Sequence, residues 1–150
     1  MKTIAEVMSR DAVNVTSDDN IRRAAELMKD LDIGALPVTE NGRVIGMITD
    51  RDITIRATAE GRGPEDTLVT AVMSADICQC YEDQTLDEVM DDMRVAQVRR
   101  IPVVSRDAHT LIGIVAIADL TQSDADDRET AQTLREISAP VPAGQEATRM

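Results

Sequence analysis

Gly46-Met47-Ile48-Thr49-Asp50-Arg51-Asp52-Ile53 has a second copy further along this chain, Gly113-Ile114-Val115-Ala116-Ile117-Ala118-Asp119-Leu120. Each copy follows a short apolar segment with a central proline, Leu36-Pro37-Val38 in one half and Ile101-Pro102-Val103 in the other. Two stretches of this kind in the same order indicate an internal repeat. A repeat decides the architecture, because each copy forms the same structural unit.

The repeat extends outward from these stretches. Upstream, Val7-Met8-Ser9 recurs as Val72-Met73-Ser74, and a short insertion near Ala108 and His109 is the main difference between the halves. The repeat therefore covers most of the chain. We expect residues 1–62 to form the first repeat, residues 63–122 the second, and residues 123–150 an acidic, mostly disordered tail with little apolar surface.

Local patterns in the first half predict the order of its elements. Val13 and Val15 alternate as in a short strand, and a helix with apolar residues at helical spacing follows Asn20, a good N-cap. Gly34 fits the end of this helix. Two strands then flank a hairpin turn at residues 40–42, with Pro37 tolerated near an edge or start. A last helix from Asp52 is expected to stop at Gly61.

The second half gives the same order, and Thr85-Leu86-Asp87-Glu88 has the form of a capping box. We therefore predict an α/β (α+β) fold in which a β-α-β-β-α unit occurs twice.

Composition excludes several classes of function. The chain has 16 Lys and Arg against 28 Asp and Glu, a net charge of −12, which repels nucleic acid and anionic membranes. No apolar run is long enough to cross a bilayer, and the first residues lack the apolar core of a signal peptide. The two cysteines are too few for a disulfide framework. We expect a cytoplasmic protein.

The repeated stretches closely resemble a tandem pair of CBS domains, also called a Bateman module, over about residues 3–122. The resemblance implies two repeats related by a pseudo-two-fold axis, with two clefts between them. It also implies a non-catalytic regulatory module that binds AMP, ADP, ATP or a related adenosyl ligand, and that pairs into a homodimer. A ligand-free module that dimerises or regulates a partner protein is the alternative.

The resemblance further implies roles for individual residues. Asp52 and Asp119 would each accept hydrogen bonds from two ribose hydroxyls, and Thr49 would donate to a phosphate near the amides of a helix start. In the second copy, Ala116 stands at the position of Thr49 and has no hydroxyl. Arg99 and Arg100 would bind the phosphates there instead. The remaining ligand-binding candidates are apolar residues expected to line the clefts: Ala12, Ile33, Gly34, Ile77, Val98 and Ile114.

Each of these residues also has a plain structural interpretation. Asp52 can cap its helix, Arg99 and Arg100 can lie on a solvated strand edge, and the apolar candidates can be core residues. The repetition of the motif favours ligand binding over these alternatives.

Neither a metal site nor a catalytic site is expected. Cys78 and Cys80 would share one face of a strand, but two thiolates do not complete a tetrahedral site, so small buried strand residues are the better interpretation. His109, the only histidine, falls in a predicted turn, which leaves almost no material for a nucleophile–histidine arrangement. No P-loop or G-x-G-x-x-G is present. We expect no cofactor apart from the regulatory nucleotide.

Overall fold

The chain forms two compact units in the computed structural model, which describes residues 2–121. The first-repeat unit contains residues 13–77 and 108–111. The second-repeat unit contains residues 2–12, 78–107 and 112–121. The predicted tail, residues 123–150, lies outside the described residues, and the repeat boundaries at residues 62 and 122 stay a prediction.

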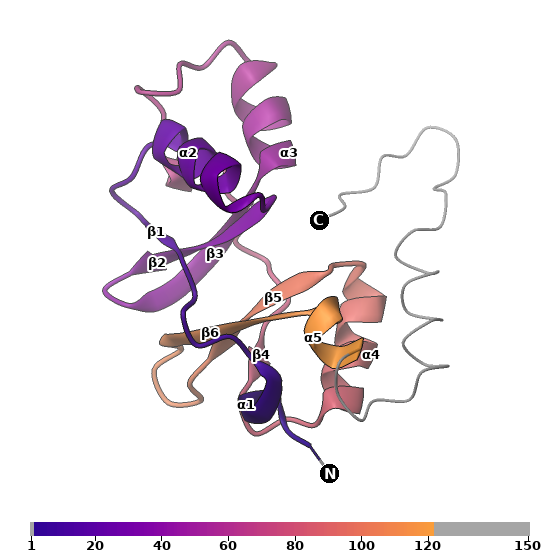
Figure 1. The fold of residues 1–150 in the computed structure, drawn as a ribbon. Helices are drawn as coiled ribbons and strands as arrows, with labels where there is room; N and C mark the ends of the chain where they lie inside the picture. Colours follow the sequence, from indigo (N-terminus) through magenta and orange to yellow (C-terminus); the bar gives the residue numbers. More distant parts are fainter. Residues whose placement is uncertain (1, 122–150) are drawn as a thin grey trace, which may run out of the picture. The chain divides into compact units, whose positions relative to one another are not determined.

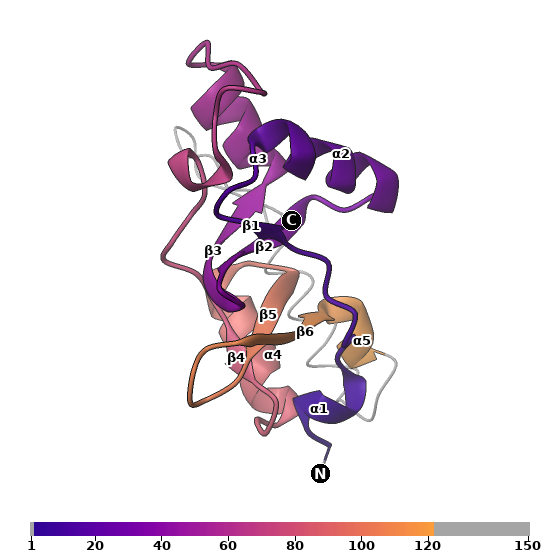
Figure 2. The same cartoon turned by 90° about the vertical axis from the view of Figure 1, so that its left-hand side faces the viewer.

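The first-repeat unit is a three-stranded sheet with helices. Its elements are β1 (Val15–Thr16), α2 (Ile21–Leu31), β2 (Ala35–Glu40), β3 (Arg43–Thr49), α3 (Asp50–Asp52), the π-helix Ile53–Thr58 and the 3₁₀ turn Val69–Ala71. β2 lies in the centre, parallel to β1 and antiparallel to β3. Figures 1 and 2 show α2 and α3 on the same side of this sheet.

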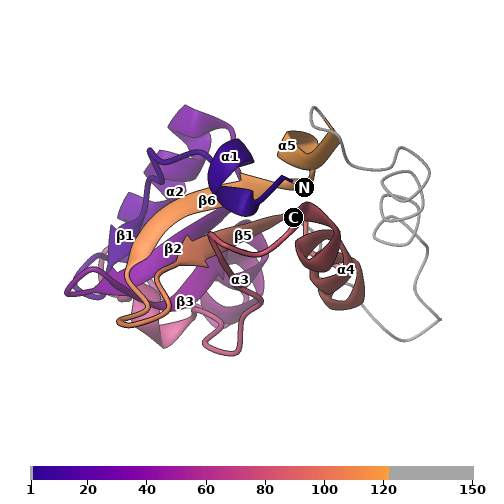
Figure 3. The same cartoon turned by 90° about the horizontal axis from the view of Figure 1, so that it is seen from below.

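The second-repeat unit has the same order of elements after a short leading helix, α1 (Ile4–Val7). They are β4 (Cys80–Tyr81), α4 (Leu86–Ala96), β5 (Arg100–Val104), β6 (Leu111–Ala116) and α5 (Ile117–Thr121). The sheet order is β4-β5-β6, with β4 and β5 parallel, and α4 and α5 lie beside each other in Figure 3. The predicted α/β fold with two β-α-β-β-α repeats is confirmed.

Each unit has its own aliphatic core. In the first-repeat unit, the apolar residues that the helical spacing singled out, such as Ile21, Ala24 and Met28, pack against the strand residues Leu36 and Ile48. The core of the second-repeat unit also lacks aromatic residues, and its fully buried members include Val89, Met90, Met93, Ile101 and Val103.

The start of α2 follows the sequence prediction, whereas its end does not. The Asn20 side chain accepts a hydrogen bond from the Arg23 N–H, as an N-cap should. The helix ends at Leu31, and its C-cap is Asp32, which takes the left-handed conformation (φ 53°), so Gly34 is not the C-cap. Asp tolerates this conformation better than most residues do, and Gln97 adopts it at the equivalent end of α4 (φ 56°).

Pro37 occupies the central strand, and the pairing explains why it is tolerated. It lies opposite Met47 on β3, but the N–H and C=O of Met47 bond to Ser74 rather than to β2. On the other side, β1 pairs only from Val38 onward. The missing N–H of Pro37 therefore costs no sheet hydrogen bond.

Two turn signals are confirmed. Asn41 and Gly42 both have positive φ (53° and 80°), as a two-residue hairpin turn between twisted strands requires. The last helix of this unit starts at Asp50 rather than at Asp52 and ends at Thr58, and Gly61 (φ 74°) lies in the turn after it. The capping box at Thr85 is only half formed: Thr85 accepts the Glu88 N–H, while the Glu88 carboxylate accepts a hydrogen bond from Gln84.

Candidate functional site

Thr49 and Asp52 form a closed pair at the end of β3. The Thr49 N–H donates to Asp52 Oδ2 (3.1 Å), and the Asp52 N–H donates to Thr49 Oγ1 (3.0 Å). Both residues are buried, at 4% and 6% exposure. One oxygen of Asp52 is therefore fixed by the main chain, which sets the direction in which the other oxygen points.

Gly34, a predicted ligand residue, lies beside this pair. Its carbonyl accepts the Asp50 N–H (3.0 Å), and a Cβ on Gly34 would lie 3.0 Å from Asp50 Oδ2. Ile33 is half-buried against the core of the same unit. The structure thus brings Ile33, Gly34, Thr49 and Asp52 together. Ile77 is half-buried at the end of this unit, outside any helix or strand.

Arg56 is a neighbour of Asp52 that the sequence analysis missed. Its Nε lies 3.8 Å from Asp52 Oδ1, and its Nη1 donates to the main-chain carbonyls of Val72 (3.3 Å) and Met73 (3.2 Å). It stands in the π-helix Ile53–Thr58, a rare element that is often found at functional sites. The signal available in the sequence was the i, i+4 spacing of Asp52 and Arg56 on a predicted helix.

The second-repeat unit repeats the arrangement around Asp119. The Ala116 N–H donates to Asp119 Oδ2 (2.8 Å), and the Ile117 N–H donates to the Arg99 carbonyl (2.9 Å). Asp119 is therefore held like Asp52, and Arg99 takes the place of Gly34. Asp119 is half-buried, and the Thr49 hydroxyl has no counterpart because residue 116 is alanine.

Arg99 and Arg100 stand at the start of β5. Arg99 is exposed and Arg100, the first strand residue, is half-buried. Four of the predicted apolar candidates also belong to this unit, and all of them are half-buried: Ala12, Val98, Ile114 and Ala116.

The two half-sites share one chemical group and differ in charge. Each offers a carboxylate with one oxygen fixed by a main-chain N–H, a suitable acceptor for paired hydroxyls. The first half-site has the Asp50 carboxylate beside Gly34, whereas the second has Arg99 in the place of Gly34.

Cys80 packs as predicted, as a buried residue of β4, whereas Cys78 lies before that strand and does not share a strand face with it. Cys80 is fully buried, and the half-buried Cys78 packs against the same core. Burial raises the pKa of Cys78 to about 11 and that of Cys80 to about 12, with a smaller contribution from nearby Asp92 to both. Within residues 2–121, no three His, Cys, Asp or Glu side chains gather as a metal site would require.

In the same part of the chain, every helix is too short or too polar to traverse a lipid bilayer.

Comparison with known proteins gives consistent results along most of the chain. The profile of the CBS domain matches residues 4–57 and 69–126. The CBS domain-containing protein YhcV of Bacillus subtilis is 36% identical over 138 residues, which are 92% of this chain and 96% of that protein.

Solved structures show the same fold. The crystal structure of Hypoxic Response Protein I, which has two coordinated zinc ions, superposes with a TM-score of 0.74 at 34% identity, over 81% of this chain and 98% of that one. The CBS domain pair of protein MJ0100, in complex with 5′-methylthioadenosine and S-adenosyl-L-methionine, has a TM-score of 0.70 at 24% identity, over 81% and 94% of the two chains.

Proposed function

Because this chain belongs to the CBS-domain family, we propose that it is a non-catalytic regulatory module that binds an adenosyl ligand through Asp52 and Asp119. The observation that carries this proposal is the equivalent holding of the two carboxylates. Each accepts a main-chain N–H from the residue three positions earlier, at 3.1 Å and 2.8 Å. Both side chains are thus oriented before a ligand arrives, which lowers the entropic cost of binding.

A ribose fits such a group well. A carboxylate only accepts hydrogen bonds, and the 2′ and 3′ hydroxyls of a ribose can both donate to one carboxylate. The structure of the MJ0100 pair indicates that this fold can hold adenosyl ligands.

The base and the phosphates would be held by different residues. We propose that Arg99 and Arg100 bind the phosphates of AMP, ADP or ATP at the Asp119 half-site, where guanidinium groups would make charge-assisted hydrogen bonds. Half-buried apolar residues would contact the adenine, because they can cover a flat ring without losing hydrogen bonds: Ala12, Ile33, Gly34, Ile77, Val98, Ile114 and Ala116.

Calorimetric titration tests the proposal. The protein, stripped of any copurified ligand, is titrated with adenosine, AMP and ATP, while guanosine and GMP serve as controls for the base. Saturable heat with the adenine compounds and none with the guanine compounds is the expected result. Absence of heat with all of them, together with no adenosyl compound in the denatured supernatant, would contradict ligand binding.

Exposed apolar side chains support a second candidate function, an interaction module that contacts another protein chain. Val95 on α4 is 77% exposed and Leu31, the last residue of α2, is 45% exposed. We propose that such residues contact a second copy, so that the protein is a homodimer. Light scattering should then give about twice the 16.4 kDa of one chain, and Val95→Asp should shift the mass toward one chain.

The proposed location is the cytoplasm. Cys78 and Cys80 are both free thiols, which suits a reducing compartment.

A further inference from the structure

The first turn of the helix after β3 has already used its main-chain amides. The Asp50 N–H donates to the Gly34 carbonyl (3.0 Å), and the Arg51 N–H donates to Asp50 Oδ1 (2.8 Å). The Asp52 N–H donates to Thr49 Oγ1 (3.0 Å). All three N–H groups therefore already have an acceptor within the chain. The sequence had led us to expect that amides at the start of this helix would bind a phosphate.

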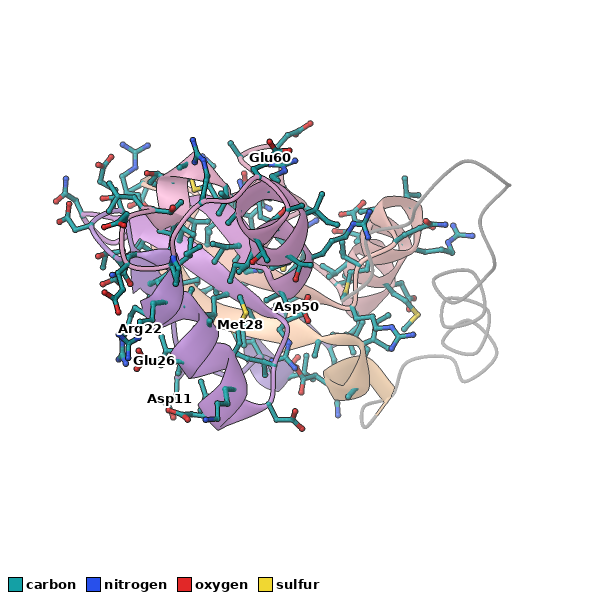
Figure 4. The ribbon with its side chains drawn as sticks, turned by 90° about the horizontal axis from the view of Figure 1, so that it is seen from above. Asp11, Arg22, Glu26, Met28, Asp50 and Glu60 are labelled. Atoms are coloured by element: carbon teal, nitrogen blue, oxygen red, sulfur yellow. The ribbon has the colours of Figure 1, made fainter. Side chains whose placement is uncertain are left out.

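The Asp50 carboxylate itself lies against the start of this helix. One of its oxygens accepts the Arg51 N–H, and the other lies 3.0 Å from the place of a Cβ on Gly34. Figure 4 shows Asp50 where β3 ends and the helix begins. The negative charge that favours a helix N-terminus is therefore supplied by the chain itself.

The second half-site lacks this carboxylate. The bond between the Ile117 N–H and the Arg99 carbonyl corresponds to the bond between the Asp50 N–H and the Gly34 carbonyl. Where the first copy has the pair Asp50 and Gly34, the second therefore has Ile117 and Arg99. An acidic side chain over a glycine is replaced by an apolar side chain and a cation.

We propose that Asp50 is a specificity-determining residue, which makes the Asp52 half-site select adenosyl ligands whose 5′ substituent is uncharged or cationic and reject 5′-phosphates. This inference rests on the proposed binding of an adenosyl ligand through Asp52 and Asp119. It assigns the two half-sites to different ligands: thioethers or sulfonium compounds at Asp52, and nucleotides at Asp119.

The electrostatic argument depends on distance. A ribose held by Asp52 would place its 5′ substituent a few ångströms from the Asp52 carboxylate. Thr49, the residue expected to contact a phosphate, is the direct neighbour of Asp50 in the chain. At neutral pH the phosphate of AMP carries nearly two negative charges, because its second pKa is about 6. Arg51 and Arg56 are the cations nearby, but Arg56 is engaged by Asp52 and the carbonyls of Val72 and Met73.

The test isolates the first half-site in an Asp119→Asn background. Asn keeps an oxygen for the Ala116 N–H but replaces the second carboxylate oxygen by a donor. In this background we expect calorimetry to show binding of 5′-methylthioadenosine and S-adenosylmethionine, and binding of AMP that is weaker by roughly fivefold or more, as expected for one like-charge pair about 4 Å apart in water.

The substitution Asp50→Asn in the same background gives the sharper result. It keeps the oxygen that accepts the Arg51 N–H and removes only the charge. The affinity for AMP should rise by roughly fivefold, while the affinity for S-adenosylmethionine should fall and that for 5′-methylthioadenosine should stay unchanged. Damage to the fold would lower the affinity for all three ligands together. Glu60→Gln, which removes an exposed charge in the turn that follows the same helix, controls for net charge.

The outcomes separate this inference from the proposed function. If the adenosyl compounds bind but Asp50→Asn leaves the order of affinities unchanged, Asp50 has no part in selection and the proposed function stands. Asp50 is equally excluded if AMP binds best and Arg51→Gln abolishes the preference, since Arg51 would then hold the phosphate. If no adenosyl compound binds either half-site, the proposed function fails and this inference fails with it.

Discussion

Met47 and Ser74 exchange both of their main-chain hydrogen bonds, each 2.9 Å long. Ser9 and Ile114 do the same in the second-repeat unit, also at 2.9 Å. The first segment of each repeat therefore adds a strand-like partner to the sheet of the other repeat, which is why residues 2–12 belong to the second-repeat unit. Gly46 and Gly113, each one residue before the paired strand position, allow this close approach.

Gly46→Ala should destabilise the protein by roughly 1–3 kcal/mol, the usual cost of overpacking a core. A Cβ at Gly46 would lie 2.7 Å from the Ser74 carbonyl oxygen and 2.8 Å from the Met73 sulfur. The sulfur can move, but the carbonyl is held by the pairing with Met47. Urea denaturation measures the change in the free energy of unfolding.

Gly113→Ala is the matched variant, because its Cβ would meet the Ser9 carbonyl oxygen and the Met8 sulfur, both at 2.8 Å. Gly63→Ala serves as the control, since the nearest atom there is a carboxylate oxygen of Asp66 at 3.2 Å. If Gly46→Ala and Gly113→Ala cost no more than Gly63→Ala, the pairing does not constrain these positions.

The order of strands and helices was predictable because each signal is local. The cap of α2 depends only on Asn20 and the first turn of the helix. The hairpin turn depends only on Asn41, Gly42 and their neighbours. The exchange of leading segments was not predictable, because Ser9 pairs with Ile114, far along the chain, and the recurrence of Val7-Met8-Ser9 marks the repeat without indicating which strand it joins. The assignment of Gly34 to a helix end failed because Asp32 tolerates the same left-handed conformation.

The candidate site was also predictable in part, but because of the repeat rather than because of local signals. Asp52 and Asp119 could be found because they repeat, and the structure holds both in the same way. Arg56 could not be found in this way, since the second copy has no equivalent arginine four residues after Asp119. The position of the Asp50 carboxylate depends on the contact with Gly34, which only the folded chain creates.

Asp52→Ala should weaken adenosyl binding at its half-site roughly five- to hundredfold, because two hydrogen bonds of about 0.5–1.5 kcal/mol each are lost. It should also lower stability, because the Thr49 N–H loses its acceptor in a buried site. Asp52→Asn keeps that acceptor, so it should weaken binding with a smaller loss of stability. Calorimetry and thermal unfolding separate the two effects. Equal binding by all three proteins would show that Asp52 does not contact the ligand.

Arg106→Lys should change the surroundings of Tyr81, the only aromatic residue of the chain. The Arg106 guanidinium lies 4.2 Å from the centre of the Tyr81 ring and holds Asp83 through Nε and Nη2, both at 2.8 Å. Lysine keeps the charge but cannot form this fork. Near-ultraviolet circular dichroism of Tyr81 should change, whereas Arg62→Lys, at an exposed site, should leave it unchanged.

The same substitution should raise the pKa of Asp83, which the hydrogen bonds from Arg106 hold below its usual value of 3.8. A depressed carboxyl pKa stabilises the folded state above the unfolded pKa, and that contribution is lost as the pH falls through the folded pKa. Because both groups are exposed, stability near pH 7 should hardly change. An NMR titration of the Asp83 carboxyl that is unaffected by Arg106→Lys would contradict this assignment.

The two cysteines should make the protein less stable above pH 9. Burial first, and then Asp92, raises the pKa of Cys78 to about 11, and burial, Cys78 and Asp92 raise that of Cys80 to about 12, from an ordinary 9.0. A thiol that resists ionisation in the folded state ionises first in the unfolded state. The unfolded chain then binds fewer protons, so the free energy of unfolding falls as the pH rises from 9 toward 11.

The slope of this decline is the quantity to measure. Each thiol contributes at most about 1.4 kcal/mol per pH unit, and the half-buried Cys78 contributes less than the buried Cys80. Because alanine does not ionise, replacing both cysteines by alanine should flatten the slope between pH 9 and 11. The same replacement should lower the stability at pH 7. Native protein at pH 8 should also react slowly with iodoacetamide, since only the thiolate is nucleophilic. Parallel slopes in the two proteins, or rapid alkylation of the folded chain, would show that the thiols are accessible and ionise normally.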